Sequence, residues 1–591
     1  MKPKAWLKKF LIWRMRHIQD QQFVLILAVF TGLLSGLAAI IVKNSAHFIK
    51  ELLQDSIVYD YQAYLNFLYP LIGTLLVIIF VKYIIKQPVG EGIPEVLFSI
   101  SRRSGFMKIH HMFSSVVSSA LTIGFGGSGG LEGPSVSTAT SLSSNLAKLM
   151  HVNYKTRILL LGCAAAGTMS AIFNAPIAAI VFAIEVLMLD LTLGSILPLL
   201  IASISASIFS YLLVGEETVF AVELNYLFTV KHTLFFILLG VVCGWISIYV
   251  IRTSNFISEF FSKYKNPFKK WLFAGSLLGL LVLLMPPLYG EGYEIINGLL
   301  DGNGKQVIED SFWSDYAHIT PVVLGLILGL VIFKIIATGL TVAAGGIAGI
   351  FAPTLFMGSC LGFVFAATFN WLSPWELPLG VFALVGMAGL MAGILHAPLM
   401  AIFLIAEITS GYTLFVPLMI TAAIAFLTSK YFQKHSLYTE KLAAKGNLLT
   451  HHADNNVLTL LRLDKMVERN FQTIHREMKL GDLVQVIAKA KRNIFPVLNE
   501  EKELIGIVTL DDIRHIMFDH GMYEKYTVAD FMHAPSGIVD INENMATVMN
   551  KFRDTGAWNL AVVKNKKYEG FVSKSKLFSA YRSKLREFSQ D

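Results

Sequence analysis

Long apolar runs without a charged residue constrain this chain more than any other feature, in a sequence that is 54% hydrophobic and 15% charged. They cover residues 23–42, 67–81, 158–184, 191–215, 233–251, 271–290, 335–375, 377–406 and 408–429. Several are long enough to cross a bilayer. Others are cut by Gly and Pro, and broken helices are tolerated at membrane depth only where protein or a water-filled cavity surrounds them. The sequence therefore predicts an all-α, multi-pass membrane domain with broken helices.

The distribution of charge divides the 591-residue chain into three parts. Residues 1–20 are basic, residues 21–446 are largely apolar, and residues 447–591 have the composition of a soluble domain. Basic residues ahead of the first apolar run predict a cytoplasmic N-terminus, so we expect a protein of the cell membrane with both termini in the cytoplasm. The net charge of +8 fits basic residues beside the membrane. No basic–aromatic pattern points to a nucleic-acid partner.

One glycine-rich stretch stands out inside the apolar part. Residues 124–136 hold six glycines and a single carboxylate, Glu132, followed by Pro134. Pro favours the first turn of a helix, and a carboxylate in an apolar run is a functional candidate by default. The stretch predicts a loop that opens a helix, whose free N–H groups would face an anion or Glu132 itself. The structural alternative is a packing face between helices, with Glu132 paired to another side chain.

An internal repeat organises the apolar part. The matching segments are 90–95 and 290–294, 126–134 and 345–353, and 164–176 and 386–398, followed by Glu185 and Glu407. The matches keep the same order at offsets of 200 to 222 residues. Two homologous halves with Gly/Pro-interrupted segments at matching positions are typical of transporters whose site lies between the halves.

These motifs resemble the CLC family of chloride channels and chloride/proton antiporters. The resemblance covers residues 20–446 and rests on segments 90–94, 130–134 and 349–353 and on the late Tyr438. It implies a homodimer in the lipid bilayer. Each all-α subunit would hold two inverted repeats and its own pathway for chloride or another small anion.

The resemblance also assigns roles to single residues. Glu132 corresponds to the gating glutamate, which occupies or leaves the outer anion site. Tyr438 corresponds to the tyrosine whose hydroxyl closes the central site from inside. The expected anion-binding residues are Glu91, Gly92, Ile93, Gly133, Ile350, Phe351 and Tyr438.

Two positions depart from the family pattern. The family's first motif usually carries a Ser where this chain has Glu91, and an ionised carboxylate there would repel a bound halide. Antiporters usually carry an inner proton-transfer glutamate where this chain has Val186. Val186 favours a gated chloride channel as the leading hypothesis, with a proton-coupled chloride antiporter as the alternative. The neighbouring Glu185 has a counterpart in the second repeat, Glu407, which favours a structural role.

The soluble part resembles a pair of CBS motifs, small α/β modules that often bind adenosine nucleotides. Segments 493–512 and 557–576 are the two copies. In the first copy, Thr509 and Asp512 are the candidate nucleotide-binding residues, whereas Lys576 stands at the position of Asp512 in the second. A purely structural dimerisation module is the alternative.

Anion transport therefore leads among three function classes. A membrane-anchored nucleotide-sensing scaffold is a more remote alternative, but it leaves the repeated glycine-opened segments without a role. An enzyme is not expected, because no catalytic residues or metal pair with the required spacing stand out. We expect no required cofactor, chloride as the transported ligand, and at most an adenosine nucleotide at the CBS pair.

Overall fold

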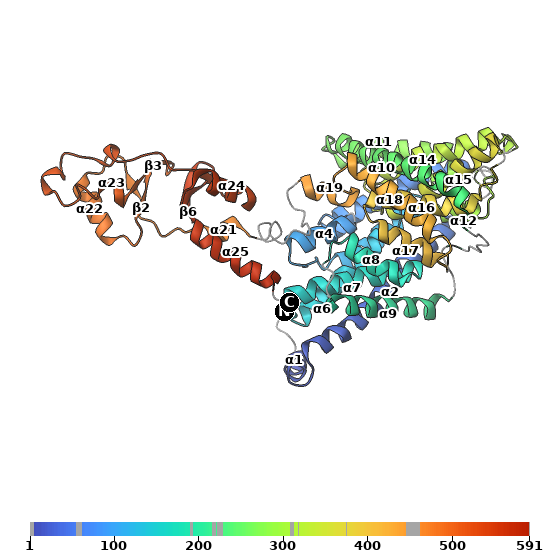
Figure 1. The fold of residues 1–591 in the computed structure, drawn as a ribbon, viewed down its shortest axis with the longest axis horizontal. Helices are drawn as coiled ribbons and strands as arrows, with labels where there is room; N and C mark the ends of the chain where they lie inside the picture. The colour runs from blue at the N-terminus through green and yellow to red at the C-terminus, as the bar shows by residue number, and fades with distance from the viewer. Residues whose placement is uncertain are drawn as a thin grey trace. The chain divides into compact units, whose positions relative to one another are not determined.

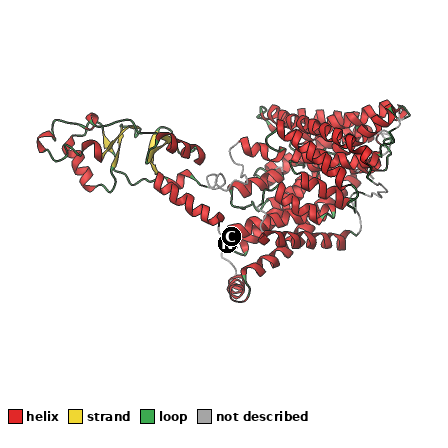
Figure 2. Ribbon diagram, viewed as in Figure 1, coloured by secondary structure: helices red, strands yellow, loops and turns green. Residues whose placement is uncertain are grey.

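The computed structural model describes residues 5–54, 62–90, 92–189, 193–215, 220, 228–305, 307, 313–316, 318–373, 375–409, 411–444 and 461–589. The chain forms two compact units, Met1–Lys445 and Gly446–Asp591 (Figure 1). In the described residues the first unit is built of helices, and the β-strands lie in the second (Figure 2).

The first unit contains long helices with shorter ones between some of them. Its helices are α1 (Ala5–His17), α2 (Asp20–Gln54), α3 (Gln62–Ile79), α4 (Ile93–Arg102), α5 (His111–Gly124), α6 (Glu132–Leu149), α7 (Tyr154–Phe173), α8 (Pro176–Glu185), α9 (Leu193–Val214), α10 (Thr233–Ser262), α11 (Pro267–Leu284), α12 (Tyr293–Leu300), α14 (Thr320–Ala343), α15 (Phe351–Leu372), α16 (Leu379–Leu395), α17 (Pro398–Ile408), α18 (Phe415–Phe432) and α19 (Leu437–Ala444). Short 3-10 or π segments are η2 (Phe80–Ile85), η3 (Val230–His232), η4 (Pro286–Leu288) and η5 (Ser314–Tyr316).

Nine stretches among the described residues are helical, long and apolar enough to cross a membrane. They include Asp20–Leu53 and Val230–Ser262, whereas α8, α16 and α17 are apolar but shorter. The predicted multi-pass membrane domain with short helices is confirmed.

Helix packing repeats between the two halves. In the first half α2 packs against α7 and α9, and in the second half α10 packs against α16 and α18. The pair α6 and α7 corresponds to the pair α15 and α16. The halves meet where α8 packs against α17. The sequence repeat is therefore a repeat of packing.

The breaks in the helices follow from local sequence. α7 ends before Asn174, which has the left-handed φ of 51°, and α8 begins at Pro176. α16 ends before His396, with φ of 56°, and α17 begins at Pro398. Asn and His enter the left-handed region more readily than most residues, and Pro suits the first helical turn but not a helix interior. Each pair therefore divides one apolar run into two helices.

The second unit contains two copies of one three-stranded arrangement. Its elements are α21 (Leu463–Met466), β1 (Ile474–His475), α22 (Leu480–Lys489), β2 (Ile494–Leu498), β3 (Leu504–Thr509), α23 (Leu510–Ile513), η6 (His520–Met522), η7 (Val528–Asp530), β4 (Ile538–Asp540), α24 (Met545–Thr555), β5 (Asn559–Lys564), β6 (Lys567–Ser573) and α25 (Lys574–Ser589). β1 runs parallel to β2, and β2 antiparallel to β3. β4, β5 and β6 repeat this order and these directions.

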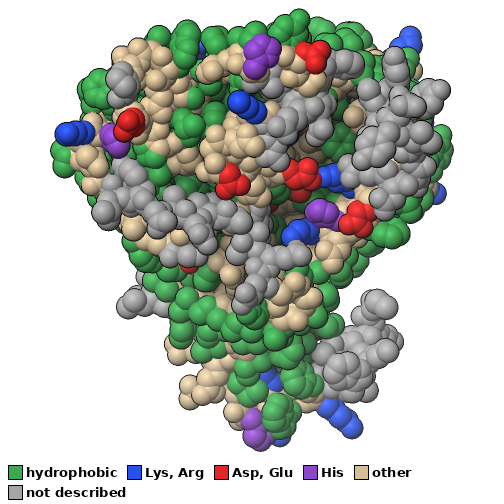
Figure 3. Space-filling model, turned by 90° about the vertical axis from the view of Figure 1, so that its right-hand side faces the viewer, with side chains coloured by type: hydrophobic (Ala, Val, Ile, Leu, Met, Phe, Trp, Pro, Cys, Tyr) green, Lys and Arg blue, Asp and Glu red, His purple; other side chains and the backbone are tan. Residues whose placement is uncertain are grey.

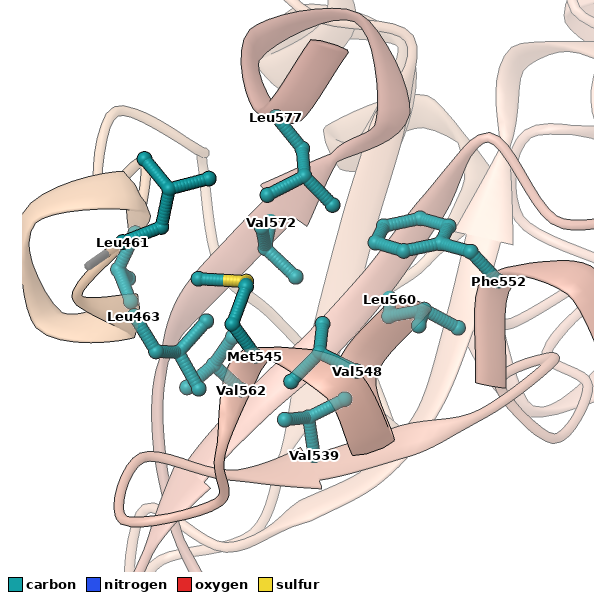
Figure 4. Close-up of a cluster of buried hydrophobic side chains, with 11 residues drawn as sticks. Leu461, Leu463, Val539, Met545, Val548, Phe552, Leu560, Val562, Val572 and Leu577 are labelled. Carbon is teal, nitrogen blue, oxygen red and sulfur yellow. The ribbon is translucent and has the colours of Figure 1, made fainter. Parts of the chain in front are cut away.

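Each copy has its own apolar core. In the second copy, buried side chains of the sheet meet those of α24, α25 and the segment around α21 (Figure 4). The residues labelled there are Leu461, Leu463, Val539, Met545, Val548, Phe552, Leu560, Val562, Val572 and Leu577. A smaller cluster of Ile507, Ala561 and Phe571 joins the two copies. The predicted α/β pair is confirmed.

Candidate functional site: three helix starts around Glu132

Helix starts from both repeats converge in the first unit. The residues before α6 and α15 exchange two main-chain hydrogen bonds, 2.8 Å from Gly130 N to Gly349 O and 2.7 Å from Gly349 N to Gly130 O. The start of α4 lies against α6, because a Cβ on Gly92 would stand 2.6 Å from the carbonyl carbon of Gly133. Gly92 also has a φ of 86°, so only glycine fits well.

Glu132 is the first residue of α6 and lies at this convergence. Its side chain is buried, with 1% of the residue exposed. The hydroxyl of Tyr293, at the start of α12, donates a hydrogen bond to Oε1 of Glu132. The N–H groups of Glu132 and Ala352 lie close enough to stabilise a charge on the carboxylate. Oε2 has no hydrogen-bond partner by ordinary geometry among the described residues.

The predicted anion-binding residues are mostly brought together here. Gly92 and Ile93 are the N-cap and first residue of α4, and Ile350 and Phe351 are those of α15. Gly133 is the second residue of α6. The first N–H groups of a helix have no partner within it and carry partial positive charge. The arrangement thus offers N–H donors to one small anion. Glu91, the remaining candidate of the first motif, lies outside the described residues.

Tyr438 lines a cavity that residues at the starts of α4 and α15 also line. The cavity measures about 190 Å³, and Pro94, Ala348 and Ile350 are among its lining residues. The Tyr438 hydroxyl is buried without a hydrogen-bond partner among the described residues. It also interacts electrostatically with Glu132. An anion in this cavity would find an unused O–H donor.

A second cavity, of about 330 Å³, lies at the segment that leads into α12. Leu131, Glu291 and Tyr293 line it, together with His47 and Lys50 of α2. On the face drawn in Figure 3, Lys, His, Asp and Glu side chains gather around a hollow. Glu132 does not line this cavity. Leu131, which precedes it in the sequence, and Tyr293, which donates a hydrogen bond to it, both do.

Three residues of this region have no role in the sequence prediction: Glu291, Tyr293 and Lys334. Lys334 is fully buried in α14 and donates hydrogen bonds of 3.2 and 2.9 Å to the carbonyls of Leu288 and Gly290. A lone lysine in an apolar run is a signal in the sequence. Glu291 lies in the repeated Gly-Glu-Gly motif, which is a second signal. No local pattern identifies Tyr293 as the partner of Glu132.

Glu185 and Val186 differ in surroundings. The Glu185 carboxylate accepts hydrogen bonds from the N–H groups of Leu399 and Met400, at 3.2 and 2.8 Å. Val186 is buried at the C-cap of α8. Glu185 thus caps α17.

Glu407 makes the corresponding contact in the other direction. It accepts from the N–H groups of Ile177 and Ala178 of α8, at 3.0 and 2.7 Å. Both carboxylates therefore satisfy helix N-termini of the opposite half.

In the second unit, Thr509 and Asp512 contact each other. Asp512 Oδ2 accepts from the Thr509 N–H at 2.6 Å and from its hydroxyl at 2.7 Å. The Thr509 side chain accepts in turn from the Asp512 N–H, which completes a capping box at the start of α23. His533 Nε2 lies 3.2 Å from the same oxygen. Lys576, at the matching position of the second copy, donates its N–H to Ser573 at 3.3 Å.

Comparison with solved structures gives the fold. A slow cyanobacterial Cl⁻/H⁺ antiporter superposes with a TM-score of 0.61 at 22% identity, over 72% of this chain and 98% of that one. A eukaryotic CLC transporter covers 94% of this chain and 97% of its own, with a TM-score of 0.60 at 17% identity. Both chains therefore share the fold described above.

Comparison with known sequences gives the family. The H⁺/Cl⁻ exchange transporter ClcA of Vibrio cholerae is 28% identical over 437 residues, which are 71% of this chain and 89% of that protein. A protein of Ralstonia nicotianae, provisionally named a ClcB-like chloride channel protein, is 28% identical over 64% of this chain and 85% of its own. A CBS-domain model matches residues 464–519. The voltage-gated chloride channel model matches residues 73–430, more than half of the chain, and the protein therefore belongs to that family.

Proposed function

We propose that this membrane protein exchanges chloride for protons. The observation that carries the proposal is the position of Glu132, a buried carboxylate at the helix starts of both repeats. The same N–H groups can stabilise either its charge or a chloride ion. Because Glu132 can also bind a proton, this one carboxylate interacts with both transported ions.

The exchange would follow from competition between the Glu132 carboxylate and the anion for the same helix starts. An ionised Glu132 occupies the helix starts and keeps the anion out. A protonated Glu132 is neutral, interacts less strongly with the helix N-termini, and yields its place to the anion. The cavity at Tyr438 supplies room for a second anion position. Each proton bound would thus open the path once.

The sequence favours passive conduction through a channel, whereas the relatives support exchange. Exchange transporters from Vibrio cholerae and from Vibrio vulnificus align with 71% and 74% of this chain. Val186 is the observation that favours a channel as the second candidate, because valine cannot carry a proton. Glu91 is the proposed replacement for the missing inner carrier.

Three further features belong to the proposal. We infer a homodimer in the bilayer, both termini in the cytoplasm, and an adenosine nucleotide at the second unit near Thr509 and Asp512. The family membership and the nine apolar helical stretches of the described residues support the membrane location. A bound nucleotide would regulate the rate of transport.

Purified protein in liposomes tests the exchange. Crossed chloride and pH gradients are imposed, and the reversal potential and the uncoupler-sensitive pH change are measured. An exchanger is displaced from the chloride reversal potential by the proton gradient. A potential that follows chloride alone at every pH gradient would contradict exchange and favour the channel.

A further inference from the structure

A second carboxylate contacts the start of α6. Glu291 Oε1 accepts a hydrogen bond of 3.1 Å from the N–H of Leu131, the residue directly before Glu132. Glu291 is partly buried and lines the 330 Å³ cavity. It therefore has one side toward the helix start and another toward the cavity.

Glu132 has no such access. Only 1% of Glu132 is exposed, and the cavity wall beside it consists of Leu131, Glu291 and Tyr293. Tyr293 already donates its hydroxyl proton to Oε1 of Glu132. Glu291 consequently connects the cavity with the residue directly before Glu132, through its hydrogen bond with the Leu131 N–H. Oε2 of Glu132 has no partner among the described residues.

The charges around Glu291 favour a mobile proton. Glu291 interacts electrostatically with Glu132 of α6, Lys43 of α2 and Lys334 of α14. The other titratable groups that line its cavity are His47, Lys50, Tyr289, Tyr293 and Glu294. Lys50 is held by Glu294 at 2.7 Å. Lys334 is fully buried and interacts with Glu291. Glu132 and Glu291 are like charges at one site, and such a pair favours the state in which one of them is protonated.

We propose that Glu291 is the outer proton-transfer residue, which takes a proton from the cavity and passes it to Glu132. A carboxylate oxygen of Glu291 takes a proton from hydronium in the cavity, whose O–H bond breaks and leaves water. The O–H bond formed on Glu291 then breaks as the proton binds Glu132, and Glu291 regains its negative charge. The reverse order returns the proton to the cavity. The inference rests on the proposed exchange function and assigns the path by which its protons reach the gate.

The test compares Glu291→Gln with Glu294→Gln in full-length protein reconstituted in liposomes. Glu294 belongs to the same segment, but its side chain is 82% exposed and paired with Lys50. Chloride movement and proton movement are measured separately over a range of pH on the cavity side. We expect Glu291→Gln to lower the proton rate by about tenfold or more and to raise the number of chloride ions moved per proton. Glu294→Gln keeps the wild-type ratio.

The outcomes separate this inference from the proposed function. A wild type that moves no protons overturns both. A wild type that exchanges protons, with Glu291→Gln at the same ratio and pH profile, overturns the role of Glu291 alone.

If Glu291→Gln does not assemble, a second variant tests the proposal by restoring the carboxylate chemically. In Glu291→Cys, iodoacetate adds a carboxylate and iodoacetamide a neutral amide of similar size. The native Cys163, Cys243 and Cys360 are fully buried and leave the new thiol as the accessible one. Proton movement that returns with iodoacetate only supports the proposal. Equal movement after both reagents contradicts it.

Discussion

Glu185 and Glu407 make the same contact in opposite directions. Glu185 ends α8 and accepts two hydrogen bonds from the first turn of α17, while Glu407 lies near the end of α17 and accepts two from the first turn of α8. Each carboxylate caps the other half of the molecule. The structural role favoured by the repeated sequence agrees with these contacts.

Loss of either cap is expected to lower the free energy of unfolding by a similar amount. Glu185→Ala and Glu407→Ala each leave two N–H groups without their acceptor, at a cost of about 1–2 kcal/mol. The measurement is the midpoint temperature of thermal unfolding in detergent. If Glu185→Ala instead keeps its stability and loses proton movement, Glu185 is a proton carrier and the capping role is secondary.

The gate variant Glu132→Gln is expected to lose the pH dependence of chloride movement. By the proposed mechanism, lower pH protonates Glu132 in the wild type and opens the path, so chloride movement should rise as pH falls. Glutamine mimics the protonated state at every pH, so its flux is flat and moves no protons. Flux assays in liposomes between acid and alkaline pH measure this. Wild-type pH dependence in a normally assembled Glu132→Gln protein excludes the gate.

Removal of the Tyr293 hydroxyl is expected to make the gate open more readily. Tyr293 donates to Oε1 of Glu132, and a hydrogen bond to a charged group contributes about 1.5–3 kcal/mol. Without it, ionised Glu132 is less stable, so protonation occurs at higher pH. In Tyr293→Phe the midpoint of the flux-against-pH curve should rise by about one to two units. Tyr289→Phe, a substitution in the same cavity wall, is the control and should keep the midpoint.

The nucleotide proposal has a matched control within the second unit. Asp512 and Asp530 each close a capping box with the Thr three residues earlier, Thr509 and Thr527. Asp512→Asn and Asp530→Asn should therefore weaken their helices by about 1 kcal/mol each. Only Asp512→Asn should also weaken ATP, ADP or AMP binding, measured by calorimetry on full-length protein. No heat from the wild type at millimolar nucleotide would favour a structural module.

The Glu91→Ser variant tests the inner route for protons. Serine restores the usual residue of the family's first motif and removes a group that binds protons. If Glu91 replaces the carrier missing at Val186, the variant should retain chloride movement and lose its displacement by a pH gradient. The reversal potential under crossed gradients measures the difference. Unchanged proton coupling would assign Glu91 to anion selectivity instead.

Much of the site follows from local sequence. Glycines, Pro134 and a lone carboxylate predict the start of α6 at Glu132, and the repeat predicts a corresponding helix start at Phe351. These signals lie within a few residues, where backbone preferences decide the structure.

Partners distant in sequence could not be predicted in this way. Glu132 and Tyr293 are 161 residues apart, and their contact depends on how α6 and α12 pack. Lys334 shows in the sequence as an isolated charge, but its acceptors are two main-chain carbonyls that no side-chain pattern reveals. Glu291 has a visible motif, yet its contact with Leu131 exists only once the two halves meet.

The hydrogen bonds between Gly130 and Gly349 limit the movements that a transport cycle can use. They bind the ends of α6 and α15 to each other through the main chain, so these ends cannot separate without breaking both bonds. In a cycle that keeps them, the movement at this point is left to side chains, above all that of Glu132. Protonation of Glu132 would then open the path by moving one side chain, while the backbone at both helix starts keeps its place.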